Sequence, residues 1–147
     1  EDLKGTASTS QANSSSIRGL KKLDLCDPNV EQDSGYINLK AGDRLFYWLF
    51  EAREDADNKP LTVYMYGGPG TSSLYGLFFQ NGPCSLNADG SGSVPRKYPL
   101  TGLSNVVWVD QPAGTGFSRG QQVSSSVEAA DKMLVSSLAS TFNSGGL

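Results

Sequence analysis

Apolar residues fall in short runs that predict β-strands. Residues 34–39 alternate apolar and polar side chains, which is typical of a strand with one buried face. After a turn at residues 41–43, residues 44–53 are apolar on both faces and predict a buried strand. These two segments should form an antiparallel hairpin. Further strands are expected at residues 61–66 and 105–110, which are rich in β-branched and aromatic residues.

Each of the last two strands leads through a glycine-rich loop into a predicted helix. The first helix covers residues 74–79, and the second follows a capping box formed by Ser125 and Glu128. Residues 85–103, rich in glycine, proline and serine, should form an irregular surface segment. Strand–loop–helix units after an antiparallel hairpin predict an α/β fold. The second helix should bury a face made of Val127, Ala130, Leu134, Leu138 and Phe142.

The beginning of the chain differs from the rest. Residues 1–22 have no apolar period and predict a flexible leader or processed tail before a folded domain at residues 23–147. Because the chain begins at Glu1 without an apolar signal region, we expect a processed chain or an excerpt. Asn13 opens an Asn-Ser-Ser sequon and is a candidate for N-glycosylation.

Composition and charge exclude several classes of function. Twelve basic and 15 acidic residues give a formal net charge of -3 without a basic stripe, which argues against nucleic acid as a partner. The longest apolar run, residues 45–50, is too short to span a membrane. The chain has no histidine, so it cannot form a Ser–His or Cys–His nucleophile pair by itself. Two cysteines are also too few for a four-thiolate zinc site, and we expect neither metal nor cofactor.

The two cysteines are Cys26 and Cys84. An even number of cysteines beside a glycosylation sequon fits a disulfide formed in the secretory pathway. A pair of buried free thiols fits these residues almost as well. The sequence leaves both alternatives open.

Both glycine-rich loops are candidates for chemistry. Adjacent glycines in Gly67-Gly68-Pro69-Gly70 leave backbone N–H groups uncovered, so this loop can approach a ligand oxygen closely, although a simple sharp turn is the alternative. The later segment, residues 116–120, matches the G-x-S-x-G pattern of a nucleophile elbow around Ser118. The strand before Ser118 and the helix after it lie too far away for that motif, and we expect an ordinary loop. Asp110, at a strand end, is either a site carboxylate or an acceptor for loop amides.

Three stretches resemble the serine carboxypeptidases of the α/β-hydrolase fold. They are residues 26–36, residues 67–74 with Asn81-Gly82-Pro83, and residues 109–118. Residues 46–53 also resemble the second strand of that family. The resemblance implies the N-terminal part of an α/β-hydrolase sheet. It also implies an enzyme that releases C-terminal residues from peptides in a vacuole, a lysosome or a secretion.

The resemblance also implies roles for single residues. Gly68 would donate its backbone N–H to an oxyanion hole, and Gly67 would lie beside the terminal carboxylate of the substrate. Tyr66 and Gln80 stand where the family usually has Asn and Glu in the network that binds this carboxylate. We therefore take Tyr66, Gly67 and Gln80 as substrate-binding candidates. Asp110, Gln111 and Pro112 would wall the site.

The catalytic serine, aspartate and histidine of the family would all follow the last residue, Leu147. We therefore expect a chain cut before the nucleophile strand that supplies the oxyanion hole and part of the carboxylate pocket and is inactive alone. A second chain would carry the remaining triad, and the peptide C-terminus would be the substrate. The alternatives are an inactive relative that binds peptides or proteins, and a truncated gene model.

The expected truncation also leads to a prediction about stability. The absent nucleophile strand would lie at the centre of the family's sheet. The strand at residues 106–109 should then expose an unpaired apolar edge, and the isolated chain should be marginally stable or aggregation-prone.

Overall fold

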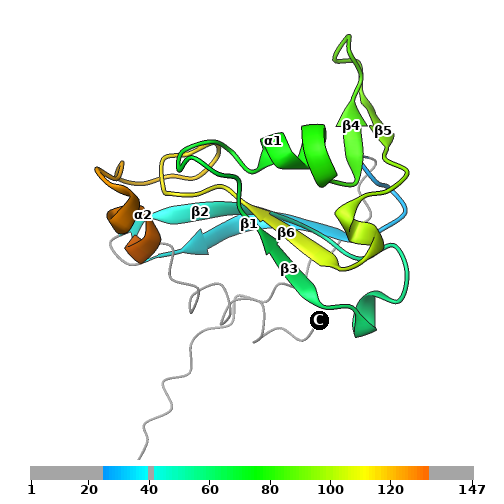
Figure 1. Cartoon of the computed structure of the whole chain (residues 1–147), viewed down its shortest axis with the longest axis horizontal. Coiled ribbons are helices and arrows are strands. Elements are labelled where there is room, and N and C mark those ends of the chain that lie inside the picture. Colours follow the sequence, from blue (N-terminus) through cyan, green and yellow to red (C-terminus); the bar gives the residue numbers. More distant parts are fainter. Residues whose placement is uncertain (1–24, 40–41, 133–147) are drawn as a thin grey trace, which may run out of the picture.

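The computed structural model describes residues 25–39 and 42–132. A four-stranded sheet in the order β1-β2-β6-β3 forms the centre of this part, and a two-stranded sheet pairs β4 with β5 (Figure 1). The strands are β1 (Gln32–Asn38), β2 (Arg44–Phe50), β3 (Leu61–Tyr64), β4 (Cys84–Leu86), β5 (Ser93–Pro95) and β6 (Asn105–Val109).

Short helices connect these strands. The α-helical turn α1 passes directly into a π-helical segment, η3, and both lie over the sheet in Figure 1. None of the described helices is long and apolar enough to cross a membrane. The helical elements are η2 (Ala56–Asn58), α1 (Leu74–Gly76), η3 (Leu77–Asn81), η4 (Leu100–Gly102) and α2 (Ser126–Lys132).

The hairpin and the α/β class predicted from the sequence are confirmed. β1 and β2 pair antiparallel from Gln32 opposite Phe50 to Asn38 opposite Arg44. β2 also pairs antiparallel with β6, and β6 pairs parallel with β3. The parallel pair requires a crossover, which α1, η3 and the β4–β5 hairpin provide.

The expectation of an open edge on residues 106–109 is wrong. β6 lies between β2 and β3 and is paired on both sides, with all five of its residues buried. After β3, the crossover returns the chain so that β6 inserts between β2 and β3. The local sequence pattern does not reveal this strand order. Within the described sheet, β1 and β3 are the outer strands.

β2 separates two hydrophobic clusters because successive side chains of a strand point to opposite faces. Leu45, Tyr47 and Leu49 join one cluster, with Ile37, Val107, Val109 and Ala113. Trp48 and Phe50 join the other, with Cys26, Val30, Leu77, Cys84, Val106 and Trp108. The second cluster lies beneath the crossover, so it fixes α1 and η3 on the sheet.

Two further expectations need correction. Residues 85–103 are not wholly irregular, since β4, β5 and η4 fall within or overlap this segment. In α2, Val127 is 71% exposed and Ala130 is exposed, whereas Ala129 is buried. A few apolar residues in a short helix do not fix which face packs. Leu134, Leu138 and Phe142 lie outside the described residues, as do the predicted leader at residues 1–22 and the sequon residue Asn13.

Candidate functional site

The first glycine loop follows directly from the end of β3. Gly67 and Gly68 are both exposed. Gly68 has φ +140°, which side-chain-bearing residues rarely adopt, and a Cβ placed there would lie 3.2 Å from the Gly70 nitrogen. Within the described residues, neither the Gly67 nor the Gly68 N–H donates a hydrogen bond. The loop therefore presents backbone donors that remain available to a ligand oxygen.

Ser73 fixes this loop to the sheet. Its side chain is fully buried, and its hydroxyl donates to the Val109 carbonyl at the end of β6. The same oxygen accepts the Tyr66 N–H at 3.0 Å. One buried hydroxyl thus joins the residue before the glycines to the central strand.

Asp110 joins the first glycine loop to the second. Its Oδ1 accepts the Ser72 hydroxyl at 2.6 Å and the Ser73 N–H at 2.8 Å. Its Oδ2 accepts the Phe117 N–H at 2.9 Å. Only 1% of Asp110 is exposed, so this carboxylate is enclosed by loop donors. Of the two interpretations that the sequence left open, the geometry shows the acceptor of loop amides.

Ser118 is a structural residue, as expected. Its hydroxyl donates to the Asp110 carbonyl at 2.7 Å and accepts the Phe46 N–H at 2.7 Å. Only 5% of the residue is exposed. Because both hydrogen bonds are made within the fold, the G-x-S-x-G pattern around Ser118 marks a surface loop that a buried serine anchors.

Tyr66 and Gln80 come together from two different elements. The Gln80 side-chain amide donates to the Tyr66 hydroxyl at 3.4 Å and accepts the Tyr64 hydroxyl at 2.9 Å. All three polar groups lie toward solvent. Burial, followed by the coulombic interaction with Tyr66, raises the pKa of Tyr64 above its usual 10.0.

Tyr64 is a residue that the sequence reasoning missed. In the sequence, Tyr64 stands out only as an aromatic residue of the strand predicted at residues 61–66. Tyr64 and Tyr66 stand two positions apart, however, which places them on the same face of an extended chain. That spacing, next to a glycine loop, was the available signal.

The remaining candidates are spread around the two loops. Gln111 donates its side-chain amide to the Tyr66 carbonyl at 3.4 Å. Pro112 lines a hollow of about 390 Å³, together with Pro69 and Gly70 of the first loop and residues 113–115 and 122–126. Tyr66, Gly67 and Gln80 do not line this hollow. Among the described residues, no cluster of three or more His, Cys, Asp or Glu side chains is arranged to hold a metal ion.

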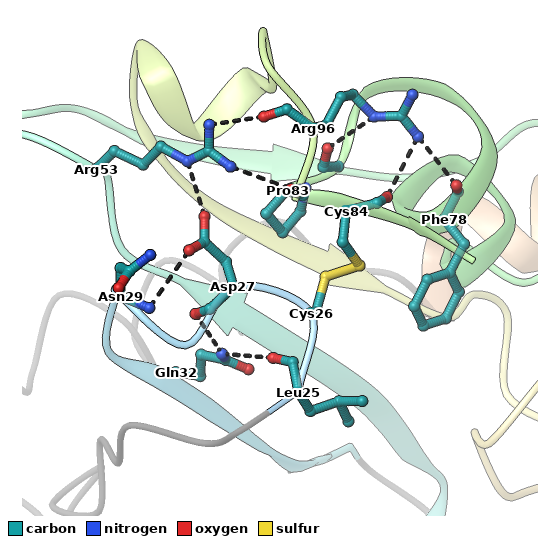
Figure 2. The surroundings of a disulfide bond; sticks show 11 residues. Leu25, Cys26, Asp27, Asn29, Gln32, Arg53, Phe78, Pro83, Cys84 and Arg96 are labelled. Carbon is teal, nitrogen blue, oxygen red and sulfur yellow. Dashed lines mark hydrogen bonds and ion pairs between the residues drawn. A yellow bond between two sulfur atoms is a disulfide. The ribbon is translucent and has the colours of Figure 1, made fainter. Parts of the chain in front are cut away.

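A disulfide joins Cys26 to Cys84 (Figure 2). It connects the loop before β1 to β4, immediately after the η3 segment that carries Gln80. Both cysteines are buried. The disulfide therefore anchors one end of the Gln80 segment to the core.

Two arginines hold the same region through backbone carbonyls (Figure 2). Arg53 forms an ion pair with Asp27 at 2.7 Å and donates to the carbonyls of Arg96 and Pro83. Arg96 in turn donates to the carbonyls of Phe78, Gly82 and Cys84. Carbonyls near a helix end lack helical partners, and these guanidinium groups supply donors there. These hydrogen bonds hold the segment that carries Gln80 in place.

Comparison with known proteins identifies the family. The family profile of the serine carboxypeptidases matches residues 23–143. Carboxypeptidase S1 of Penicillium janthinellum is 39% identical over 115 residues, which cover 76% of this chain and 27% of that protein. A vacuolar serine-type carboxypeptidase of Saccharomyces cerevisiae is 40% identical over 116 residues, covering 79% of this chain and 23% of the relative.

A solved structure shows the same fold. The prohormone-processing carboxypeptidase Kex1 of Saccharomyces cerevisiae superposes with a TM-score of 0.65 at 22% identity, covering 84% of this chain and 31% of that protein. The chain thus spans about a quarter to a third of the length of these relatives. It belongs to the serine carboxypeptidase family.

Proposed function

We propose that this chain supplies the oxyanion hole and part of the substrate-terminus pocket of a serine-type carboxypeptidase. One observation carries the proposal. Gly67 and Gly68 have exposed N–H groups that donate to no acceptor in the described part of the chain, and Ser73 and Asp110 hold their loop on the central strand. A fixed backbone N–H such as that of Gly68 suits the developing oxyanion of acyl transfer, and the Gly67 N–H beside it is available to the peptide terminus.

The reaction proposed is release of the last residue of a peptide. A serine attacks the last peptide carbonyl, and the carbonyl oxygen becomes negatively charged in the tetrahedral intermediate. The Gly68 N–H donates to this oxygen and stabilises it. Because the chain has no histidine, the general base has to come from residues outside these 147.

Recognition of the peptide terminus is assigned to Tyr66, Gly67 and Gln80. The Tyr66 hydroxyl accepts from Gln80, so its own hydrogen is available to donate to a substrate carboxylate. Tyr64 fixes the orientation of the Gln80 amide by donating to its oxygen. Neither side chain is a carboxylate, so the pocket places no acidic side chain of its own beside the peptide terminus.

The first experiment uses the chain as it is. Peptides that differ only in a free or amidated C-terminus are titrated into the chain and followed by amide chemical shifts. We expect the free acid to bind and to shift the Gly67 and Gly68 resonances, while an N-blocked dipeptide is not hydrolysed. Equal binding of the acid and the amide would refute the pocket, and turnover abolished by a serine-directed phosphonate would refute the need for an external base.

The second experiment tests the oxyanion role in the assembled enzyme. Gly68→Ala should lower kcat by about 100- to 1,000-fold, because the N–H moves away from the oxyanion. Gly90→Ala is the matched control, since Gly90 also has positive φ but lies at the exposed tip between β4 and β5. An equal effect of both substitutions would contradict the assignment.

The alternative function is a peptide- or protein-binding relative without catalysis. The lack of histidine and the uncharged pair Tyr66 and Gln80 favour it. Intact-mass analysis of the natural protein separates the two. A histidine-containing partner or continuation supports the enzyme, whereas a native product of these 147 residues alone supports the binding module.

We also propose the secretory pathway, ending in a secretion or a vacuole, as the location. The buried disulfide between Cys26 and Cys84 fits an oxidising compartment. The sequon at Asn13 and the vacuolar relative point the same way. Mobility of the natural protein before and after glycosidase treatment tests this proposal, and an unglycosylated cytosolic product would contradict it.

A further inference from the structure

A hollow of about 390 Å³ lies beside the first glycine loop, and we call it the loop hollow. Pro69 and Gly70 of that loop form one wall, and residues 112–115 and 122–126 form the rest. Its volume falls within the range of pockets that bind small ligands, about 300–1,000 Å³. The residues assigned above to the oxyanion and to peptide-terminus recognition do not line it. The loop hollow is therefore a second candidate site on the same loop.

The loop hollow contains polar groups that the fold does not pair. Thr115 lines it and is only 6% exposed, yet the Thr115 hydroxyl forms no hydrogen bond with the described residues. Unlike the unpaired hydroxyl of Thr101, it is not sealed from solvent, so a ligand in the hollow can reach it. The side-chain amide of Gln122, which also lines the hollow, has no partner within residues 25–39 and 42–132 either. Because buried polar groups are normally hydrogen-bonded, the Thr115 hydroxyl points to a ligand.

The chemistry of the lining limits which ligand fits. Among the described residues that line the loop hollow, none carries a charge. Glu128 is not part of the lining, and its carboxylate accepts the Ser124 N–H at 2.8 Å and the Ser124 hydroxyl at 2.9 Å. A charged group bound in the hollow would lose hydration without a counter-charge in the lining. An apolar group would leave the Thr115 hydroxyl and the Gln122 amide unpaired. An uncharged polar group avoids both costs.

The order of residues along the first glycine loop relates the loop hollow to the proposed reaction. Recognition of the peptide terminus is assigned to Tyr66 and Gly67, the oxyanion donor is Gly68, and the hollow begins at Pro69. A peptide whose scissile carbonyl oxygen accepts the Gly68 N–H has its last residue on the Tyr66 side of the loop. The residue before the scissile bond then extends toward the opposite side, where the hollow lies.

We propose that the loop hollow binds the side chain of the residue before the scissile bond and selects an uncharged polar side chain, such as threonine. This inference rests on the proposed function, which sets the direction of the bound peptide. The Thr115 hydroxyl and the Gln122 amide form hydrogen bonds with the hydroxyl of the bound side chain. Val123, which also lines the hollow, offers an apolar contact for its methyl group.

The experiment titrates acetylated tripeptides with a free C-terminus into the full chain and follows amide chemical shifts. The peptides differ only in the middle residue, which is threonine, its isostere valine, or lysine. We expect the threonine peptide to bind about three- to tenfold more tightly than the valine peptide, which is the effect of one net hydrogen bond. The lysine peptide should bind no more tightly than the valine peptide. The shifts that depend on the middle residue should centre on Gly70, Gly114 and Thr115.

Variants of the lining test which groups provide the preference. Thr115→Val and Gln122→Ala should each lower the preference for threonine over valine by about threefold, because each removes one hydrogen-bonding group. Gln121→Ala is the matched control for Gln122→Ala, since both glutamines are exposed and Gln121 does not line the hollow. Thr101→Val is the control for Thr115→Val, since Thr101 is also buried with an unpaired hydroxyl but lies outside the lining. Both controls should keep the preference.

Failure of the loop hollow and failure of the proposed function give different results. Equal affinity for the threonine and valine peptides, a preference for lysine, or an equal loss in the control variants would overturn the hollow. The same peptides with an amidated C-terminus report on terminus recognition separately. A preference for threonine that persists while acid and amide bind equally would support the hollow and refute the terminus assignment. If no peptide binds, both are refuted. Thermal unfolding confirms that each variant is folded.

Discussion

The two glycine-rich loops look alike in the sequence and differ in the structure. In the loop at residues 67–70, a Cβ added to Gly67 would meet nothing within 4 Å. In the loop at residues 113–116, a Cβ added to Gly116 would lie 2.1 Å from the Asp110 carboxylate. The first loop is open and presents its N–H groups to solvent. In the second loop, the Asp110 carboxylate occupies the space beside Gly116.

The difference shows that a glycine run has two distinct physical causes. Glycine keeps one side of the first loop clear for a ligand, and it makes room in the second loop for the group that holds both loops. Asp110 is that group, since its two oxygens bond donors from both loops. The carboxylate that fills the second loop therefore also fixes the conformation of the first loop.

Removing the shared acid should have the largest effect. Asp110→Ala leaves three buried or half-buried donors without an acceptor, and we expect the free energy of unfolding to fall by about 3–5 kcal/mol. Asp110→Asn keeps one acceptor oxygen and should cost less. Urea unfolding measures both. If Asp110→Ala cost under about 1 kcal/mol, the two loops would not depend on this carboxylate.

Filling the two loops with one methyl group tests the comparison directly. Gly116→Ala should lower the free energy of unfolding by about 2–4 kcal/mol, because the methyl group overlaps Asp110 and the residue has φ +54°. Gly67→Ala should change it by under about 0.5 kcal/mol. In the double variant Asp110→Ala/Gly116→Ala the costs should be less than additive, because the clash partner is gone. Additive costs would contradict the clash.

Loosening the open loop without touching the acid should have a smaller effect. Ser73→Ala leaves the Tyr66 N–H and the Val109 carbonyl without their shared hydroxyl, at a cost of about 1–3 kcal/mol. Hydrogen exchange should accelerate at the Tyr66 N–H, which loses its acceptor, but not at the Phe117 N–H. Equal acceleration in both loops would show that Ser73 supports the whole region rather than the open loop.

The smallest effect is expected for the hydrogen bond between Tyr47 and Asp33. This pair lies outside both glycine loops and serves as a reference for changes within them. Tyr47 donates to Asp33 at 2.6 Å, and burial, followed by this hydrogen bond and the charge of Asp33, raises the pKa of Tyr47 far above its usual 10.0. The folded state then holds a proton that the unfolded state loses above pH 10. The free energy of unfolding should therefore fall above that pH by at most about 1.4 kcal/mol per pH unit. Tyr47→Phe should flatten this decline, and an unchanged alkaline slope would contradict it.

Part of the site followed from local patterns. The glycine loops and the strand before each depend on residues near one another in the chain. The spacing of Tyr64 and Tyr66 indicates a shared face, but it does not reveal that Gln80 lies beside that face and accepts the Tyr64 hydroxyl. The backbone bridge between Arg44 and Arg119 is a further feature that no local pattern predicts, because it joins distant segments of the chain.

The sequence by itself determined the hairpin, the α/β class, the family and the lack of histidine. Alternating and continuous apolar runs encode which strands are half-buried and which are fully buried. Tertiary structure alone decided that β6 lies between β2 and β3, that Cys26 and Cys84 meet, and that Asp110 faces two loops. These outcomes depend on how apolar side chains pack on both faces of the sheet and on contacts between segments that are distant in the chain. The spacing of apolar residues within one segment does not contain that information.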